Sequence, residues 1–405
     1  MGIPLVLLIT YHFPPDNAIG GARPYRFYKY LKRIGYECHI ITAAVQEAGA
    51  SADIEYVSDP FETEPHGRIA WHIERIGRKF LWGTGLKLQW SASAFRAGRS
   101  FLKRRKNDKI VILSSAPPVA THLVGMGLSA CSGRPWIADF RDPISSAFDG
   151  HFSLHNIVAN GLTWLVMWRT DLALANTDAM HRSWCSRYPG LGSKTRTLWN
   201  GFDPEDTIGT YVLPMRERKI LSHVGELYGG RSIRPVLQAA LRLIENGRLD
   251  AKNILIRQIG LAEQGELPDA DFLQTAQADG WLELREPVPA KEARSMALES
   301  DGLLLIQPQT AVQVPAKLFE YLRLGRPILA YVMRDSPAMH ILQQAGVSFE
   351  CIFPGDTPER IEKQLLNFIA MLDGQPVIYN QWFVDNFDAS RQVETLDAMI
   401  RVLTG

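Results

Sequence analysis

The chain has 405 residues, of which 46% are hydrophobic and 21% charged, and its formal net charge is +1. This length is too great for one ordinary core and suits two domains of about 200 residues each, and the composition excludes an intrinsically disordered protein. The four cysteines show no CxxC spacing, which indicates a reducing compartment where they act as small buried hydrophobes. No apolar run is long enough for a signal peptide or a membrane span, so we expect a cytoplasmic protein.

The small net charge hides an asymmetry along the chain. Residues 1–200 carry 24 Lys and Arg against 15 Asp and Glu, whereas the remainder carries 20 against 28. Most of the basic excess falls in segment 68–109, which has 12 basic and two acidic residues. Halves of opposite sign indicate two units that meet different partners.

In the first half, short apolar runs alternate with helical patterns, which predicts a parallel sheet covered by helices. The first run is apolar on both faces, as a strand between two helical layers requires. The helix after it begins near Pro24 and ends at Gly35. Strands are predicted over 4–10, 38–42, 109–113, 135–139, 171–175 and 195–199.

The same alternation restarts after the polar segment 203–218, which we interpret as a linker. The pattern predicts an α/β fold of two Rossmann-like domains, with a ligand cleft between them at the carboxyl ends of the strands. The expected domains are 1–202 and 219–380, closed by C-terminal helices over 381–405. The predicted strands are 219–224, 253–259, 281–285, 301–307 and 327–332, with helices at 232–246, 289–299 and 315–324.

The familiar short motifs are missing, and their absence moves attention to loops that follow strands. The sequence contains no GxGxxG, GxxxxGK[ST], HExxH or GxSxG pattern, which argues against a dinucleotide oxidoreductase, a P-loop hydrolase, a zinc protease and an α/β-hydrolase. Gly20 and Gly21 follow the first strand, and GELYGGR (225–231) follows the first strand of the second half. A single Gly-Gly pair is more often a flexible turn. Two such loops at equivalent places favour phosphate binding, and the guanidinium of Arg231 can donate two hydrogen bonds to phosphate oxygens.

Two further segments carry candidate residues with a structural alternative. In VPAKLFEY (314–321), Lys317 lies in the first helical turn, where a bound anion would offset the unfavourable helix dipole, and Glu320 can accept hydrogen bonds from a ribose diol. The alternative is an exposed Lys–Glu pair. Asp139 and Arg141 follow a strand together with Asp142, and they suit either a cleft or a salt-bridge corner, with Asp142 interpreted as structural. His122 faces the cleft or packs in the core. Asp139 and His122 are therefore secondary catalytic candidates.

Taken in order, several segments resemble family 4 glycosyltransferases, retaining enzymes of the GT-B fold. The resemblance covers nearly the whole chain, and VPAKLFEY is typical of a subgroup of polysaccharide and lipid-linked sugar enzymes. It implies a UDP- or GDP-linked sugar donor, retention of anomeric configuration, and no metal or other cofactor. The matching segments are YHFPPDNAIGGARPYRFYKYLKRIG, PWIADFRDP, LWNGFD, VGELYGGR and VPAKLFEYLRLGRPILA.

The resemblance also assigns roles to individual residues. Gly20 and Gly21 would approach the donor diphosphate and sugar from the first domain, and Arg231 would bind the diphosphate. Lys317, whose role is predicted from its charge and not from the resemblance, would help to stabilise the departing diphosphate. Glu320 matches the second glutamate of the family's Glu–seven residues–Glu motif, which holds the ribose hydroxyls. The main chain near Pro287 and Val288 would lie beside the base.

Two positions depart from the family pattern. Val312 replaces the first glutamate of the motif, so the glutamate's work on the sugar passes to Gln313, to main-chain amides at 310–314, or to no residue. Val236 stands where the family has a lysine, and Arg234 or Lys317 would supply that charge.

The basic segment 68–109 mixes its cations with aromatic residues, which suits contact with an anionic membrane surface. Its alternative is a pair of solvated helices with aromatics in the core. Nucleic acid is not expected, because no nucleic-acid module accompanies the charge. The expected membrane contacts are Arg78, Lys79, Trp82, Lys103, Arg104, Arg105 and Lys106.

The sequence thus predicts a peripheral enzyme on the inner face of the membrane that transfers a sugar from a nucleotide-sugar donor to a lipid-linked or polysaccharide acceptor. One alternative is a nucleotide-sugar-binding protein whose Val312 marks lost catalysis. Another is an isomerase resembling nucleotide-sugar 2-epimerases, which would need cleft carboxylates for proton abstraction.

Overall fold

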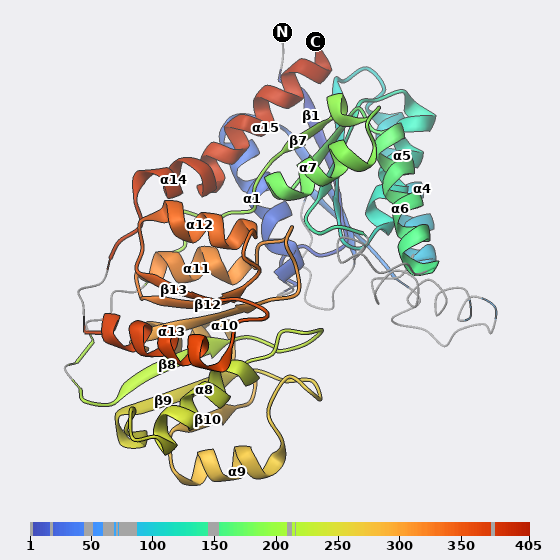
Figure 1. The fold of residues 1–405 in the computed structure, drawn as a ribbon. Coiled ribbons are helices and arrows are strands. Elements are labelled where there is room, and N and C mark those ends of the chain that lie inside the picture. The colour runs from blue at the N-terminus through green and yellow to red at the C-terminus, as the bar shows by residue number, and fades with distance from the viewer. Residues whose placement is uncertain are drawn as a thin grey trace. The chain divides into compact units, whose positions relative to one another are not determined.

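The computed structural model describes residues 3–16, 19–43, 52–59, 69, 72, 87–144, 154–208, 213–214, 216–373 and 377–405. The chain forms two compact units, unit 1 (Met1–Pro204 with Asn386–Gly405) and unit 2 (Glu205–Asp385). Each unit contains one sheet with helices packed on it (Figure 1). In the described parts of the chain, no helix is long and apolar enough to cross a membrane.

Unit 1 is built on a seven-stranded parallel sheet in the order β3-β2-β1-β4-β5-β6-β7. Because the chain first builds outward from β1 on one side and then returns to β1's other side, β1 and β4 form a topological switch point. The strands are β1 Leu5–Thr10, β2 Cys38–Ala43, β3 Ile54–Val57, β4 Ile110–Ala116, β5 Trp136–Phe140, β6 Leu172–Ala175 and β7 Thr195–Thr197.

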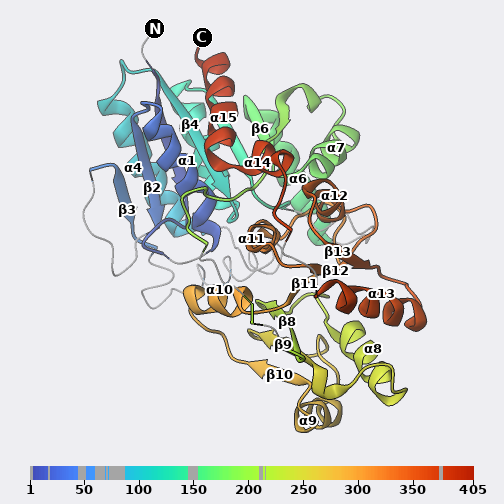
Figure 2. The ribbon, with the colours of Figure 1, turned by 90° about the vertical axis from the view of Figure 1, so that its left-hand side faces the viewer.

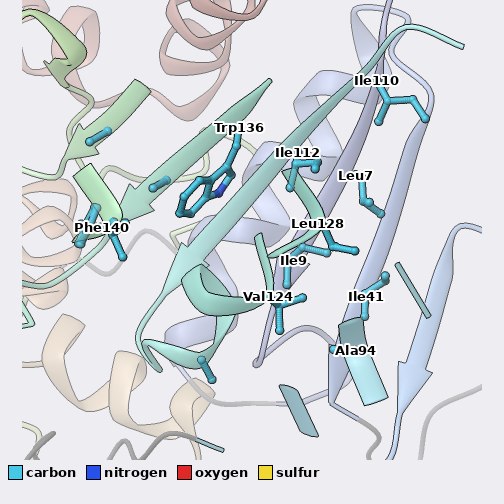
Figure 3. Packing of buried hydrophobic residues seen from close by; sticks show 14 of the residues in the cluster. Leu7, Ile9, Ile41, Ala94, Ile110, Ile112, Val124, Leu128, Trp136 and Phe140 are labelled. Carbon is cyan, nitrogen blue, oxygen red and sulfur yellow. The ribbon is translucent and has the colours of Figure 1, made fainter. Parts of the chain in front are cut away.

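Helices cover both faces of this sheet, as the two-sided apolar pattern of the first strand predicts. Leu7 and Ile9 of β1 pack in the cluster that contains α4, α5, α6 and α7 residues (Figure 3). Val6 and Leu8 face the other way, toward α1 and α15. The helices are α1 Ala22–Arg33, α4 Leu88–Arg104, α5 Ala120–Ser132, α6 Leu154–Arg169, α7 Asp178–Arg187 and α15 Ala389–Thr404.

Unit 2 repeats the plan with a six-stranded parallel sheet in the order β10-β9-β8-β11-β12-β13, so that its switch point lies between β8 and β11 (Figure 2). The strands are β8 Lys219–Val224, β9 Ile254–Ile259, β10 Leu282–Arg285, β11 Gly302–Gln307, β12 Ile328–Val332 and β13 Phe349–Ile352. The helices are α8 Arg234–Glu245, α9 Ala270–Ala278, α10 Ala290–Leu298, α11 Ala316–Leu324, α12 Pro337–Ala345, α13 Pro358–Met371 and α14 Gln381–Phe387.

The predicted α/β class and its strands are confirmed, with differences at the sheet edges and among the cysteines. The sequence patterns missed β3 and β13, which lie at edges and are only partly buried, so neither forms a continuous apolar run. Cys38 and Cys351 are buried as expected. Cys131 is exposed and Cys185 only partly buried, which corrects the expectation for these two.

We expect α15 to be integral to unit 1 although it is distant in sequence. Leu396 is fully buried against the β1 and β4 face, whereas Val402 on the same helix is 82% exposed. Leu396→Ala should lower the free energy of unfolding by about 2–5 kcal/mol because it leaves a cavity. Val402→Ala should change it by less than about 0.5 kcal/mol. Urea denaturation measures both, and equal effects would contradict the packing.

Candidate functional site

The switch point of unit 2 brings a glycine loop next to a lysine. Gly225 follows β8 with a φ of +128°, and a Cβ atom built on it would lie 2.5 Å from Lys317 Nζ. Only glycine therefore lets Lys317, in the first turn of α11, reach the main chain at the end of β8. The carboxyl ends of β8 and β11 are where open parallel sheets bind ligands.

A chain of hydrogen bonds fixes where the Lys317 ammonium lies. Gln258 on β9 donates through Nε2 to the carbonyl oxygen of Gly225 at 2.9 Å, which leaves its Oε1 as an acceptor. His223 Nδ1 lies 2.6 Å from that Oε1 and must donate to it. Its Nε2 is then an acceptor, 3.0 Å from Lys317 Nζ. The tautomer of His223 is thus set by its neighbours.

The surroundings of Lys317 disfavour its positive charge. Burial, with a smaller effect of the Arg231 cation, lowers the pKa of Lys317 from 10.5 to about 7, and Glu226 and Glu320 oppose this only in part. Burial and the neighbouring Lys317 hold the pKa of His223 well below its usual value, so His223 is neutral. A bound anion would offset both effects on Lys317.

Arg231 adds a second cation to the same edge. Its guanidinium lies 4.4 Å from the centre of the Tyr228 ring and donates to the Tyr228 hydroxyl at 2.9 Å. Its Nε is buried and has no hydrogen-bond partner among the described residues. The described carboxylates form no ion pair with Arg231 or Lys317. Two cations without an ion-pair partner among the described residues therefore lie at this edge, and an anion would complement them.

Sequence reasoning overlooked several polar residues at this edge. Gln307 ends β11 and Gln309 follows it, and the side-chain oxygen of each is buried without a partner in the described structure. The Cβ of Gln309 lies 3.5 Å from the position of a Cβ on Gly230, so the loops after β8 and β11 meet. His223 and Gln258 were also missed. Their only signal is a polar residue at the buried carboxyl end of an apolar strand.

Arg234 and Val236, which the sequence analysis weighed beside Lys317, have other contacts in unit 2. Arg234 donates to the carbonyl oxygens of Gly265 and Leu267 at 3.0 and 2.8 Å, so its charge is committed to that loop. Val236 is fully buried in the unit 2 core. Lys317 instead lies beside Gly225 at the end of β8. Val312 is buried and presents no carboxylate.

The remaining donor candidates all lie at the carboxyl edge of the unit 2 sheet. Glu320 on α11 is half-exposed and accepts from Arg294 Nε at 2.7 Å. Pro287 is exposed and Val288 partly exposed, in the loop between β10 and α10. Gln313 is partly buried between β11 and α11. Their roles toward ribose, base and sugar stay predictions.

In unit 1, Gly20 and Gly21 lie in a short 3-10 helix, η1 (Ile19–Gly21), directly before α1. The buried Arg141 donates to the carbonyl oxygens of Gly20, Ala116 and Pro117, and so ties the loop after β1 to the loop after β4. A Cβ on Gly20 would lie 2.9 Å from the Arg141 guanidinium. The glycine is required by this packing, whatever else approaches it.

Asp139 does not fit its predicted catalytic role, because it is enclosed in a buried ion pair. Its carboxylate is fully buried and lies 2.7 Å from Arg23 Nη2, and it also accepts from Ser115 Oγ at 2.7 Å. Arg23 also donates a hydrogen bond to the carbonyl oxygen of Leu198 at 2.8 Å. Asp139 is thus a structural residue that joins β5 to α1.

His122 likewise belongs to the core, which is the second of the two placements that the sequence left open, and this position does not suit a catalytic role. The imidazole is fully buried, 2.8 Å from Ser114 Oγ through Nδ1, and its ring centre lies 4.3 Å from that of Phe140. Burial lowers its pKa to about 3, so it stays neutral at ordinary pH. Its size fills the space between β4 and α5.

The expected membrane contacts are only partly described. Arg78, Lys79 and Trp82 lie outside the described residues. At the end of α4, Lys103, Arg104 and Lys106 are exposed, whereas Arg105 pairs with Glu37 and Asp108. Trp90 and Phe101 from the same segment are buried in the core, so these aromatics are not membrane anchors. No described group of three His, Cys, Asp or Glu side chains is placed to hold a metal ion.

Solved structures resemble the whole chain. No protein-family model and no curated protein sequence matches it. The crystal structure of Anabaena Alr3699/HepE in complex with UDP and glucose has a TM-score of 0.62 at 14% identity and covers 98% of this chain and 99% of its own. The chain has the GT-B fold.

Two more structures agree with this assignment. Sucrose-phosphate synthase from Thermosynechococcus elongatus has a TM-score of 0.62 at 10% identity, covering 99% of this chain and 96% of its own. The apo form of the lipopolysaccharide outer core galactosyltransferase WaaB has a TM-score of 0.61 at 13% identity, covering 98% and 99%. At these identities the likeness establishes the GT-B fold and no more.

We predict that anion binding at unit 2 depends on pH through Lys317. Above pH 7 the free protein loses the Lys317 proton and a bound diphosphate restores it, so UDP affinity should fall between pH 7 and 9, by at most about tenfold per unit. The terminal phosphate of UDP, with a pKa near 6, is ionised throughout. Lys317→Met should bind more weakly at pH 7 and show no such slope. Calorimetric titration of UDP into each protein at several pH values measures the affinity and its pH dependence. An equal pH dependence in the variant would show that the proton taken up on binding is not on Lys317.

We also predict that Asp139 contributes to stability. Asp139→Asn leaves Arg23 buried without its counter-charge and should cost about 3–5 kcal/mol in chemical denaturation. The apolar double variant Arg23→Met with Asp139→Leu should recover a substantial part of that loss. Wild-type stability in Asp139→Asn, together with lost activity, would restore the catalytic assignment.

Proposed function

We propose that the protein is a glycosyltransferase that takes a sugar from a nucleotide-diphosphate donor, UDP- or GDP-linked, and passes it to a lipid-linked or polysaccharide acceptor. The observation that carries the proposal is the pair Arg231 and Lys317 at the β8–β11 switch point, neither of which forms an ion pair with a described carboxylate. The fold supports it, since structures of HepE with the same fold contain UDP and UDP-glucose.

In the proposed reaction, the main task of the protein is to stabilise the nucleoside diphosphate as it leaves the sugar. As the glycosidic bond breaks, negative charge grows on the diphosphate, and Arg231 and Lys317 would stabilise it through charge-assisted hydrogen bonds. The acceptor hydroxyl forms the new bond with the anomeric carbon, and its proton passes to the departing phosphate. The anomeric configuration is retained when both events occur on one face of the sugar.

The other predicted contacts follow the same arrangement. Glu320 would accept from the ribose hydroxyls, with its Arg294 ion pair orienting the carboxylate. Main chain beside Pro287 and Val288 would meet the base. Gln313, or amides at 310–314, would take the sugar hydroxyls in place of the carboxylate that Val312 lacks. We further propose that Lys103, Arg104 and Lys106 face an anionic membrane surface on the cytoplasmic side.

The buried Val312 favours one rival, a nucleotide-sugar-binding protein without transferase activity. Such a protein would bind UDP and transfer nothing to any acceptor. An isomerase is less suited to the structure, because its proton abstraction needs an available carboxylate and Asp139 is enclosed by Arg23.

A donor-binding experiment tests the proposal. UDP at 100 times its dissociation constant should stabilise the wild type by about 2.7 kcal/mol, seen as a thermal shift. Arg231→Ala removes charge-assisted hydrogen bonds and should weaken UDP by about ten- to hundredfold. Arg248→Ala, at a half-exposed arginine paired with Glu362 at 3.5 Å in the same unit, is the control and should bind normally.

The ribose contact has its own comparison. Glu320→Ala should weaken UDP but leave 2′-deoxy-UDP nearly unchanged, because only UDP offers the full diol. Absence of a shift with UDP and with GDP would refute the donor assignment. Binding that survives Arg231→Ala would place the nucleotide elsewhere.

A further inference from the structure

Helix α6 of unit 1 presents an apolar face to solvent. Trp164 and Trp168 are 46% and 49% exposed, and their rings stack in parallel with centres 5.7 Å apart. Ile157 and Gly161 continue the same stripe at helical spacing, and Val158 lies beside it, exposed as well. These five residues, Ile157, Val158, Gly161, Trp164 and Trp168, are called the α6 face. A contiguous exposed apolar face of this kind is typical of an interaction surface.

The described charges around the α6 face are basic. Arg169 lies over the Trp168 ring at 5.0 Å, Arg187 donates to Asn160 at 2.7 Å, and Lys194 Nζ donates to the carbonyl oxygen of Trp168 at 3.2 Å. Helix α6 itself contains no acidic residue. In residues 154–200 the acidic residues are Asp171 and Asp178, and Asp171 accepts from the main chain of Trp136. Residues 154–200 therefore bring an excess of positive charge to this face, and its rim is called basic on that ground.

The strand topology places further cations at the same end of the sheet. Residues just before parallel strands all enter at the amino edge. Arg169 and Lys194 precede β6 and β7, and the exposed cluster Lys103, Arg104 and Lys106 precedes β4. Helices α4, α5 and α6 cover one face of the sheet (Figure 1). The aromatic pair and these cations thus lie toward one side of unit 1.

We infer that the α6 face docks on an anionic lipid bilayer, with Trp164 and Trp168 at the level of the headgroups and the basic rim against lipid phosphates. Stacked tryptophans beside cations suit the membrane interface, where one side of the ring meets acyl chains and the other meets water. The inference rests on the proposed function in one respect, since docking would hold the enzyme where a lipid-linked acceptor is embedded.

Charge decides against a second copy of the chain as the occupant. A symmetric dimer would set the α6 face against itself and bring each basic rim onto the other. An anionic surface complements the rim instead.

Gly161 offers a direct test, because a side chain added there meets no atom within 4 Å. Gly161→Glu should place a negative charge in the α6 face without disturbing the fold. Flotation with vesicles of equal parts phosphatidylglycerol and phosphatidylcholine should show wild-type binding that falls about tenfold in Gly161→Glu. The double variant Trp164→Ser, Trp168→Ser should fall similarly, and pure phosphatidylcholine should bind the wild type weakly. Val402→Ser, at a residue 82% exposed on α15, is the matched control and should float like the wild type.

Either of two results would overturn the inference. One is wild-type binding that is absent or unaffected by both α6 variants. The other is a wild-type dimer in sedimentation velocity that Gly161→Glu converts to monomer, which would make the partner a second copy. The UDP thermal shift of each variant separates the two proposals. An α6-dependent vesicle interaction without any nucleotide shift would refute only the donor assignment, and a normal UDP shift without vesicle binding would refute only the docking surface.

Discussion

The topological switch point is the constraint on which both units depend. In each sheet the chain adds strands to one side of the first strand and then to its other side. The loops that follow the two central strands therefore leave the carboxyl edge in opposite directions, and side chains or a ligand fill the space between them. In unit 1 the gap at β1 and β4 is filled from within, since Arg141 donates to carbonyl oxygens of both loops. In unit 2 the gap at β8 and β11 holds Arg231 and Lys317.

The contrast between the two units is one of charge compensation. Unit 1 buries Arg23 with the carboxylate of Asp139 and surrounds Arg141 with carbonyl oxygens, so each cation is satisfied by the protein. Among the described residues, the partner of Lys317 at hydrogen-bond distance is the neutral acceptor His223. A buried cation lacking a counter-charge is costly in the free protein, and it is this cost that a bound diphosphate would remove. The same fold thus satisfies its buried cations in unit 1 and leaves Lys317 of unit 2 without an ion pair among the described residues.

The two units differ in how their exposed and buried polar groups are distributed, and this difference agrees with the separate functions proposed for them. Unit 2 concentrates its unsatisfied positive charge and unpaired amide oxygens at a single edge, as binding of a small anionic molecule requires. Unit 1 instead spreads exposed cations and an apolar helix face over a surface, which suits an extended partner. The two halves of the sequence also carry opposite net charges, which is typical of units with different partners.

The sequence by itself determined the features that depend on neighbours along the chain. Strands such as β1 and β11 are apolar on both faces, so their type and the α/β class follow from a local pattern, and the Gly225–Arg231 loop follows from its position after a strand. Only the tertiary structure decided the partners of buried polar groups. Asp139 is paired with Arg23 from 116 residues away, and Lys317 with His223 from 94. Such contacts produce no repeating pattern in the sequence. The partner of a buried charge is the polar group that the folded chain brings near it, and its distance along the sequence can have any value.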